Sequence, residues 1–229
     1  MKKIAIIAQK GGVGKTAIAV NLAVATGKRL KVALFDLDSQ ESAVIWSDYR
    51  KLDTPHVEFL TERRLSDAIK AAEVQDFDLI IIDTPPAAGP QAFAAAQTAD
   101  LILIPCKPSR IDLDAIRRTA QLIKSVGIPS YAVLNAARPS ATTLLDEARA
   151  IVKKEGLDTA PVALRERSAY RASWPQGKAV AYRVDADVSL NRPSSRASAS
   201  HRCAGLQVCA SATMPALPTA SKPAKLLLF

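Results

Sequence analysis

The sequence predicts an α/β fold, a mostly parallel, twisted sheet with helices on both of its faces. Short runs rich in Ile, Val, Leu and Ala recur along the chain, and a stretch compatible with a helix follows each of them. Runs that are apolar throughout are typical of strands buried on both faces. Strands that alternate with helices build parallel sheets, in which ligands bind at the carboxyl ends of the strands.

The elements follow from this alternation. The expected strands share a nearly continuous apolar composition: residues 3–8, 31–36, 78–83, 101–105 and 131–135, with 57–60 as a weaker candidate. The expected helices lie between and after them: residues 16–26, 41–51, 65–74, 91–97, 111–126 and 141–154. In the helix at 111–126, which has a clear helical period, four apolar residues are expected to face the core: Ile111, Ala115, Leu122 and Val126.

The composition supports a folded core and an anionic partner. Hydrophobic residues make up 48% of the 229 residues, which excludes wholesale disorder. No apolar run approaches the roughly 18 residues that a membrane span requires. Three cysteines without CxxC spacing favour a reduced, cytoplasmic protein. The 31 Lys and Arg against 22 Asp and Glu give a net charge of +9, which indicates nucleic acid or acidic lipid as a partner.

The sequence divides into two parts near Tyr182. Residues 1–181 carry the alternating pattern and are expected to form one domain. Residues 182–229 contain nine Ala, seven Ser and four Pro among 48 residues and have no sustained helical or strand period. We expect this second part to be a low-complexity, disordered tail.

A phosphate-binding loop is predicted between the first expected strand and the helix after it. The strand runs into Gln-Lys-Gly-Gly-Val-Gly-Lys-Thr, residues 9–16. Glycines allow backbone N–H groups to converge on phosphate oxygens, and the helix N-terminus adds its dipole. Lys15 is expected to reach the β- and γ-phosphates, and the Thr16 hydroxyl to ligate Mg²⁺. The sequence therefore predicts a nucleotide site in a sheet of the P-loop NTPase type.

The loop resembles the deviant Walker A family of ATPases, whose signature is KGGxGK[ST]. The resemblance implies that the matching residues bind ATP: Lys10, Gly11, Gly12, Val13, Gly14, Lys15 and Thr16. In that family the first lysine of the signature, here Lys10, crosses a dimer interface to the nucleotide of the partner subunit. The resemblance therefore implies an ATP-sandwich homodimer with Lys10 and Lys15 as catalytic residues. A second cation offsets the repulsion between two nucleotides bound face to face.

Carboxylates follow two further expected strands. Asp36 and Asp38 end the strand at 31–36 and, two residues apart, point the same way. Four apolar residues precede Asp83, as in a Walker B motif, and this carboxylate is expected to hold Mg²⁺ through water, because Mg²⁺ keeps several of its waters. The resemblance implies that Asp38 positions the attacking water and that Asp36 supports the metal shell. No candidate arginine finger is evident, so ATP hydrolysis is expected to be slow without a partner.

Two later segments resemble the small ParA-type partition ATPases. Residues 103–112 match their Pro-x-x-Pro-Ser-x-x-Asp segment, and residues 163–180 are similar to their penultimate helix and loop. Asn135 stands where relatives often read adenine, although an Asn that closes a strand is equally a turn residue. The resemblance covers residues 2–180. The tail departs from it, and we hypothesise that a change of reading frame produced the tail.

The resemblance implies an ATP-dependent DNA-partitioning ATPase, associated with the nucleoid, that segregates a plasmid or a chromosome. In the ParA-type group the ATP dimer binds DNA non-specifically, and a ParB-type centromere-binding partner triggers hydrolysis and release. The charge distribution agrees, because residues 1–106 carry 12 basic and 13 acidic residues, whereas residues 107–181 carry 13 and 7. This second half contains the candidates for contact with DNA phosphates: Arg110, Arg117, Arg118, Arg138, Lys153, Lys154, Arg165, Arg167, Arg171 and Lys178.

Two alternatives remain. A MinD-like, membrane-associated positioning ATPase requires a C-terminal amphipathic helix. Residues 222–229 are too short for a firm anchor, so no stable membrane association is expected. A metal or electron carrier on the same fold, as in iron–sulfur scaffold ATPases, needs paired thiolates. Cys106 is isolated, and the spacing of His201, Cys203 and Cys209 fits no compact zinc pattern.

Overall fold

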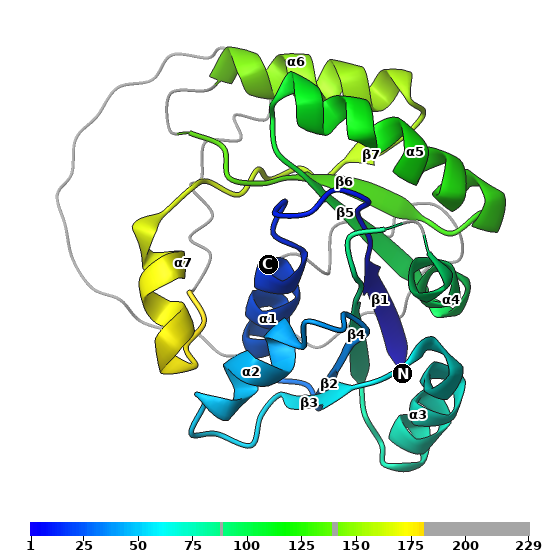
Figure 1. Ribbon diagram of the computed structural model, residues 1–229, viewed down its shortest axis with the longest axis vertical. Helices are drawn as coiled ribbons and strands as arrows, with labels where there is room; N and C mark the ends of the chain where they lie inside the picture. Colours follow the sequence, from blue (N-terminus) through cyan, green and yellow to red (C-terminus); the bar gives the residue numbers. More distant parts are fainter. Residues whose placement is uncertain (88, 139–141, 181–229) are drawn as a thin grey trace, which may run out of the picture. The chain divides into compact units, whose positions relative to one another are not determined.

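The computed structural model, drawn in Figure 1, describes residues 1–87, 89–138 and 142–180. In this part of the chain seven parallel strands form one sheet: β1 (Lys2–Ile6), β2 (Val32–Asp36), β3 (His56–Phe59), β4 (Leu79–Asp83), β5 (Leu101–Cys106), β6 (Ser130–Leu134) and β7 (Asp158–Thr159). Their order across the sheet is β3-β2-β4-β1-β5-β6-β7, so β1 lies at the centre between β4 and β5. The predicted α/β fold with a parallel sheet is confirmed.

Six helices connect successive strands in the described residues: α1 (Lys15–Thr26), α2 (Ser42–Asp48), α3 (Glu62–Val74), α4 (Pro90–Thr98), α5 (Arg110–Val126) and α6 (Thr142–Lys154). Helix α7 (Ser168–Ser173) and the short 3-10 helix η1 (Trp174–Gln176) follow β7. Their ends carry ordinary signals. Pro90 opens α4 with its preset φ, and Ser109 caps α5 by accepting a hydrogen bond from the backbone N–H of Asp112. Gly127 then ends α5 in the left-handed conformation.

The helices cover both faces of the sheet, as Figure 1 shows. Helices α3, α4, α5 and α6 follow one another across one face, and their apolar residues share a buried cluster with the strands. Helices α1 and α2 lie on the other face. Ala5 and Ile7 belong to the first face, whereas the equally buried Ile4 and Ile6 point to the second, because successive strand residues alternate.

The register of the central strands brings three chain segments together at one edge of the sheet. Asp83, the last residue of β4, is the register partner of Ile6 in β1 on one side and of Asp36 in β2 on the other. Since all the strands run in parallel, the loop that leaves β1 starts beside Asp83, with Asp36 one strand farther along the same edge. This edge is where the sequence predicts the nucleotide site.

The buried face of α5 differs from the prediction. Ile111 was expected to face the core, but its side chain is 75% exposed. The residues that are buried recur at helical spacing: Leu113, Ile116, Ala120 and Ile123. Ile111 precedes Leu113 by two residues, which places it about 200° around the helix from that face. Leu122 and Val126 are partly buried at the margin of the cluster, as expected.

Two further points concern the prediction. Strand β7 was not predicted, because its two residues, Asp158 and Thr159, are too few to produce a strand pattern. Residues 181–229 lie outside the described residues. They include the predicted tail and the three residues considered above as zinc ligands, His201, Cys203 and Cys209. Where the structure is described, no helix combines the length and the apolar character needed to cross a membrane.

Candidate nucleotide-binding site

The loop between β1 and α1 has the backbone conformation of an anion-binding turn. Gly12 and Gly14 have φ values of +70° and +96°, in the left-handed region that other residues rarely adopt. Gly14 is the N-cap residue of α1 and makes no side-chain cap. The first N–H groups of a helix lack helical partners and attract anions. This loop therefore suits phosphate oxygens.

Asn135, which directly follows β6, braces the same loop. Its Nδ2 amide donates a hydrogen bond of 2.7 Å to the carbonyl oxygen of Val13. A Cβ atom on Gly14 would overlap that nitrogen, so only glycine fits at position 14. The structure thus assigns Asn135 a role in shaping the loop. Its reading of adenine stays a prediction.

Lys15 and Asp83 are two of the buried charged groups of the site. Lys15 is 7% exposed and Asp83 is fully buried, and neither carboxylate oxygen of Asp83 has a hydrogen-bond partner among the described residues. Burial raises the pKa of Asp83 to about 7, although the Thr16 hydroxyl and Lys15 act to lower it. Burial also lowers the pKa of Lys15, although the negative charges of Asp83 and Asp38 act to raise it. A buried carboxylate without partners is costly until a cation or donor joins it.

Asp36 is equally buried but fully engaged by backbone groups. One of its oxygens accepts a hydrogen bond of 3.0 Å from the N–H of Asp38, and the other accepts one of 2.9 Å from the N–H of Ala43 in α2. Burial raises the pKa of Asp36 despite these hydrogen bonds. The carboxylate therefore fixes the turn that carries Asp38 and the start of α2. Its support of a metal shell stays a prediction.

Lys10 lies on the loop but pairs with a residue from another part of the chain. Its Nζ atom is 2.5 Å from the Oδ1 atom of Asp112, in the first turn of α5. Asp112 is the last residue of the Pro-x-x-Pro-Ser-x-x-Asp segment, and no role was predicted for it, although Ser109 and Asp112 have the S-x-x-D spacing of a capping box. The buried Thr84 was missed as well. Its hydroxyl donates a hydrogen bond of 2.8 Å to the carbonyl of Ile6, which ties the end of β4 to β1.

These residues fit a nucleotide with a divalent cation. The glycine turn and the α1 N-terminus offer N–H donors for phosphates, and Lys15 adds a buried positive charge beside them. The unpartnered oxygens of Asp83 and the neighbouring Thr16 hydroxyl are oxygen ligands of the kind that Mg²⁺ prefers. The donor set therefore agrees with the predicted chemistry.

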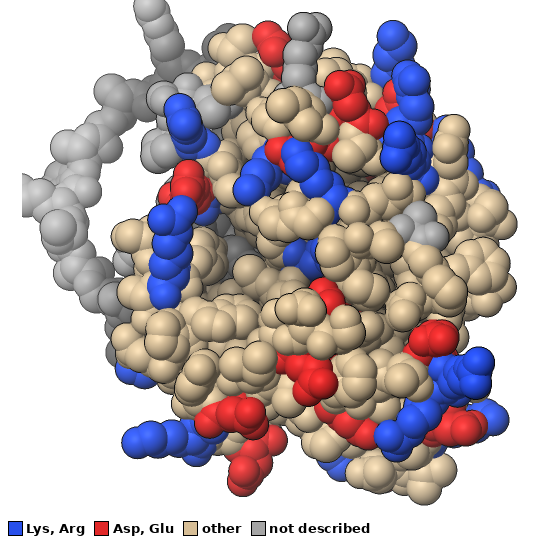
Figure 2. Space-filling model, in the orientation of Figure 1, with Lys and Arg blue, Asp and Glu red and all other residues tan. Residues whose placement is uncertain are grey.

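Predicted DNA-contacting residues lie on α5, where Arg117 and Arg118 follow each other, and at the end of α6, which carries Lys153 and Lys154. In the view of Figure 2, Lys and Arg side chains are more prominent in the upper half, where Figure 1 places α5 and α6, and acidic groups are more prominent in the lower half. Arg117 lies 3.2 Å from Glu155, and Arg171 lies 3.4 Å from Glu166. Lys153 and Lys154 are exposed in the last turn of α6.

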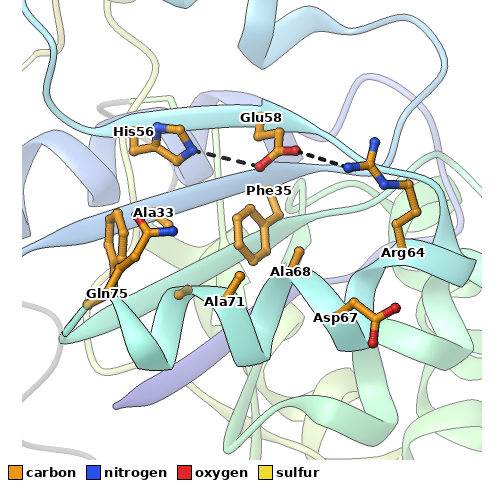
Figure 3. Close-up of a pocket in the computed structure, with 11 residues that line it drawn as sticks. Ala33, Phe35, His56, Glu58, Arg64, Asp67, Ala68, Ala71 and Gln75 are labelled. Carbon is orange, nitrogen blue, oxygen red and sulfur yellow. Dashed lines mark ion pairs between the residues drawn. The ribbon is translucent and has the colours of Figure 1, made fainter.

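A separate pocket lies between β3 and α3 and is drawn in Figure 3. Phe35 and small α3 residues, Ala68 and Ala71, form its apolar lining, and an ion-pair chain runs along its rim. In that chain Glu58 lies 3.7 Å from His56 and 3.8 Å from Arg64. None of the predicted nucleotide-binding residues lines this pocket. It is therefore distinct from the candidate site.

Comparison of the sequence with family models places most of the chain in one family. Residues 4–173 match the model described as the CobQ/CobB/MinD/ParA nucleotide binding domain. The chain is 30% identical over 183 residues to the maintenance of carboxysome distribution protein A of Gloeobacter kilaueensis, an alignment that covers 77% of this chain and 82% of the relative. It is 29% identical over 126 residues to protein ParA of Rhizobium radiobacter, covering 54% of this chain and 56% of the relative.

Solved structures resemble this one as well. The apo McdA structure from Cyanthece has a TM-score of 0.64 at 18% identity and is matched over 78% of this chain and 91% of its own. The MinD cell division protein of Aquifex aeolicus has a TM-score of 0.62 at 19% identity, with coverages of 78% and 88%. At these identities the likeness establishes the fold, and it agrees with the predicted P-loop NTPase type.

Proposed function

The chain belongs to the CobQ/CobB/MinD/ParA nucleotide-binding family, whose members are ATPases, and from this premise we propose that it is an ATP-dependent DNA-partitioning ATPase. The observation that carries the proposal is one loop with two lysines beside an unpartnered, buried carboxylate. Lys15 and Asp83 form an ATP site within the subunit. Lys10 pairs with Asp112 in its own subunit, and we propose that its ammonium group acts on the nucleotide of the partner subunit. Such a lysine is expected where two nucleotides face each other.

Each site residue has a proposed role. The N–H groups of residues 10–16 and Lys15 bind the phosphates, and Thr16 and Asp83, supported by Asp36, hold Mg²⁺. When bound, the metal neutralises charge on the phosphates. Asp38 is partly exposed at the turn that Asp36 holds, and this position suits a residue that orients the attacking water. Asn135 contributes to the base site while it braces the loop.

We propose that the ATP-bound homodimer binds DNA without sequence preference and that hydrolysis releases it. The support is electrostatic, because basic residues exceed acidic ones by 13 to 7 between residues 107 and 181. Exposed lysines at the end of α6 suit contact with phosphates and carry no information about bases. We propose that the DNA-bound protein is associated with the nucleoid. A ParB-type partner protein on the cargo would stimulate the slow basal hydrolysis and so release the protein from DNA near that cargo.

The relatives bear on the cargo. One is named for the maintenance of carboxysome distribution and another is a ParA protein, so the same ATPase cycle suits a protein body as well as a plasmid or chromosome. We propose that the chain positions a cargo through DNA, and the identity of the partner decides which cargo it is. The experiment recovers the partner of the ATP-bound protein from the native cell, with protein bodies and plasmids fractionated separately. The fraction that contains the partner shows whether the cargo is a protein body or a plasmid.

The test is ATP-dependent DNA binding by the full chain in a gel-shift assay with random-sequence duplex DNA. We expect a shift with ATP and Mg²⁺ that disappears in Lys15→Ala and in Lys10→Ala. Lys28→Ala, at an exposed lysine two residues after the end of α1, is the matched control and should shift DNA like the unmodified chain. Sedimentation with anionic liposomes runs in parallel. Lipid binding with ATP and no DNA shift would replace the proposal with the MinD-like alternative.

A further inference from the structure

Two segments that are far apart in the chain meet at the C-terminal end of α2. Arg50 follows this helix by two residues, and its guanidinium donates a hydrogen bond of 2.9 Å to the carbonyl oxygen of Gly177, the residue after η1. The two backbones also lie against each other. A Cβ atom at position 177 would come within 2.4 Å of the Arg50 backbone, and Gly177 has a φ of +58°. Only glycine therefore permits this contact.

The Arg50 side chain is fixed on two more sides. Its Nε atom donates a hydrogen bond to the carbonyl oxygen of Thr54, and its guanidinium lies 5.2 Å from the centroid of the Trp46 ring, a distance at which an aromatic face attracts a cation. The bond to Thr54 is local, whereas Gly177 is 127 residues away in the sequence. Arg50 therefore fastens the end of α2 to a distant segment.

The opposite end of α2 begins at the turn that carries Asp38. The N–H of Gln40 donates a hydrogen bond of 3.0 Å to the Asp38 carboxylate, and the N–H of Glu41 donates one of 2.9 Å to the Asp38 carbonyl. The N–H of Ile45, inside α2, donates in turn to the carbonyl of Glu41 at 2.9 Å. Because these bonds are continuous, a displacement of α2 also displaces the Asp38 side chain.

Two local costs indicate that contacts at its ends hold α2 in place. Glu41 precedes the helix in the left-handed conformation, with a φ of +49° that is unfavourable for a residue with a side chain. Trp46 is fully buried, and its indole N–H has no hydrogen-bond partner among the described residues. Strain of this kind persists only where the surrounding structure fixes the conformation. At the end of α2 that is remote from Asp38, the contact between Arg50 and Gly177 supplies this constraint.

We propose that Arg50 and Gly177 are positioning residues for ATP hydrolysis, which hold α2 and, through it, the turn that carries Asp38. The inference rests on the role proposed above for Asp38 in orienting the attacking water. Without the contact, α2 can shift to relieve the costs at Glu41 and Trp46, and the Asp38 carboxylate leaves its position. The phosphate loop belongs to another segment, so ATP binding is retained while turnover falls.

Three variants break or keep the contact, and two others are matched controls. Arg50→Ala removes it, Arg50→Lys keeps a cationic donor, and Gly177→Ala forces the two backbones apart. Ser47→Ala removes a hydroxyl of the same helix that bonds to the carbonyl of Val44 in the preceding turn. Gly127→Ala places a Cβ atom on another left-handed glycine, where it would meet open space.

The main experiment measures steady-state ATP hydrolysis by the full chain, and ATP affinity with a fluorescent ATP analogue. We expect Arg50→Ala and Gly177→Ala to lower kcat about tenfold with the affinity within about twofold, because a small misplacement caused far from the chemistry affects turnover strongly. Arg50→Lys should retain about a third of kcat or more, and both controls should stay within about twofold. Thermal unfolding confirms that each variant is folded. An unchanged kcat in Arg50→Ala or in Gly177→Ala overturns the proposal, as does an affinity that falls in parallel with kcat.

Hydrogen exchange tests the positioning without nucleotide. Mass spectrometry of the nucleotide-free protein follows the amides that connect Asp38 to α2, those of Gln40, Glu41 and Ile45. We expect these amides to exchange several-fold faster in Arg50→Ala than in the unmodified chain, with Ser47→Ala unchanged. Equal rates in Arg50→Ala and the unmodified chain contradict the proposal, whatever the hydrolysis assay gives.

Asp38→Asn separates a failure of this inference from a failure of the role proposed for Asp38. If Asp38→Asn hydrolyses ATP at the unmodified rate, the proposed role of Asp38 is wrong and the inference falls with it. If Asp38→Asn loses hydrolysis while Arg50→Ala keeps it, only the inference is overturned.

Discussion

The ends of β2 and β4 place two aspartates side by side with opposite surroundings. Asp36 and Asp83 are register partners, both close an apolar strand, and both are fully buried. Asp36 accepts two backbone hydrogen bonds, whereas Asp83 accepts none among the described residues. An aspartate at the end of an apolar strand therefore fixes the backbone after β2, whereas the aspartate at the end of β4 keeps both carboxylate oxygens available for a ligand.

Neighbouring groups explain the difference. After β2 the chain turns at once into α2, and the N–H groups of this turn and of the α2 N-terminus need acceptors, which Asp36 supplies. After β4 the Thr84 hydroxyl joins the chain to Ile6, and the backbone carbonyl of Asp83 accepts the N–H of Leu37 at 2.9 Å. Backbone and hydroxyl groups fix this strand end, so the Asp83 side chain is free for chemistry.

Asp83→Asn should have the largest effect on activity. We expect ATP hydrolysis to fall on the order of a hundredfold or more, because the substitution removes a proposed metal ligand from a buried site. The measurement is phosphate release with saturating ATP and varied Mg²⁺. Asp76→Asn, at an exposed turn whose left-handed φ suits Asn, is the matched control. If Asp83→Asn kept more than a tenth of the activity, Asp83 would not be the metal ligand.

The stability of the nucleotide-free protein should depend on pH through Asp83. The folded-state pKa of Asp83, about 7, lies above the ordinary aspartate pKa of 3.8, so the folded state retains a proton that the unfolded state loses. This contribution is fully present below pH 4 and is lost as the pH rises to about 7. From pH 5 to pH 8 the free energy of unfolding should fall by about 3 kcal/mol relative to Asp83→Asn. Denaturant unfolding of both proteins across this range gives the difference. A difference independent of pH would contradict a buried, unpartnered Asp83.

Asp36→Asn should mainly affect stability. An amide can accept one backbone hydrogen bond but turns its NH₂ group toward the second N–H, so one buried donor is left without an acceptor. We expect a loss of about 2 kcal/mol in the free energy of unfolding, with the dependence of hydrolysis on Mg²⁺ retained in the folded fraction. Denaturant unfolding and Mg²⁺ titration of the activity measure the two effects. A loss of Mg²⁺ dependence at full stability would instead make Asp36 the metal ligand.

The sequence predicted the features that depend on local pattern. The strands and longer helices follow from composition and period, and residues 9–16 identify the phosphate loop because turn, lysine and helix start are adjacent in the chain. The strand-end positions of Asp36 and Asp83 were predicted for the same reason. Their different hydrogen bonding was not, because it depends on which N–H groups the next turn leaves without a partner.

Features that join distant segments were not predictable from one sequence. The pairing of Lys10 with Asp112 depends on how the start of α5 meets the loop after β1. The bond from Asn135 to Val13 depends on the position of β6 beside β5. The misplaced Ile111 has a local cause, because two apolar sets out of phase occur on α5 and only packing against the sheet selects one.

Thr84→Val tests why the end of β4 can leave its aspartate free. Valine matches threonine in shape but lacks the hydroxyl that donates to the Ile6 carbonyl, so a buried acceptor loses a donor. We expect a loss of about 1 kcal/mol in the free energy of unfolding and an ATPase rate within twofold of the unmodified chain, because the backbone bond to Leu37 still holds the strand end. Thr98→Val is the matched control, since the Thr98 hydroxyl bonds only to the preceding turn of its own helix. A large loss of activity at full stability would mean that the Thr84 hydroxyl acts in the nucleotide site together with Asp83. The hydroxyl would then not serve only to hold the end of β4.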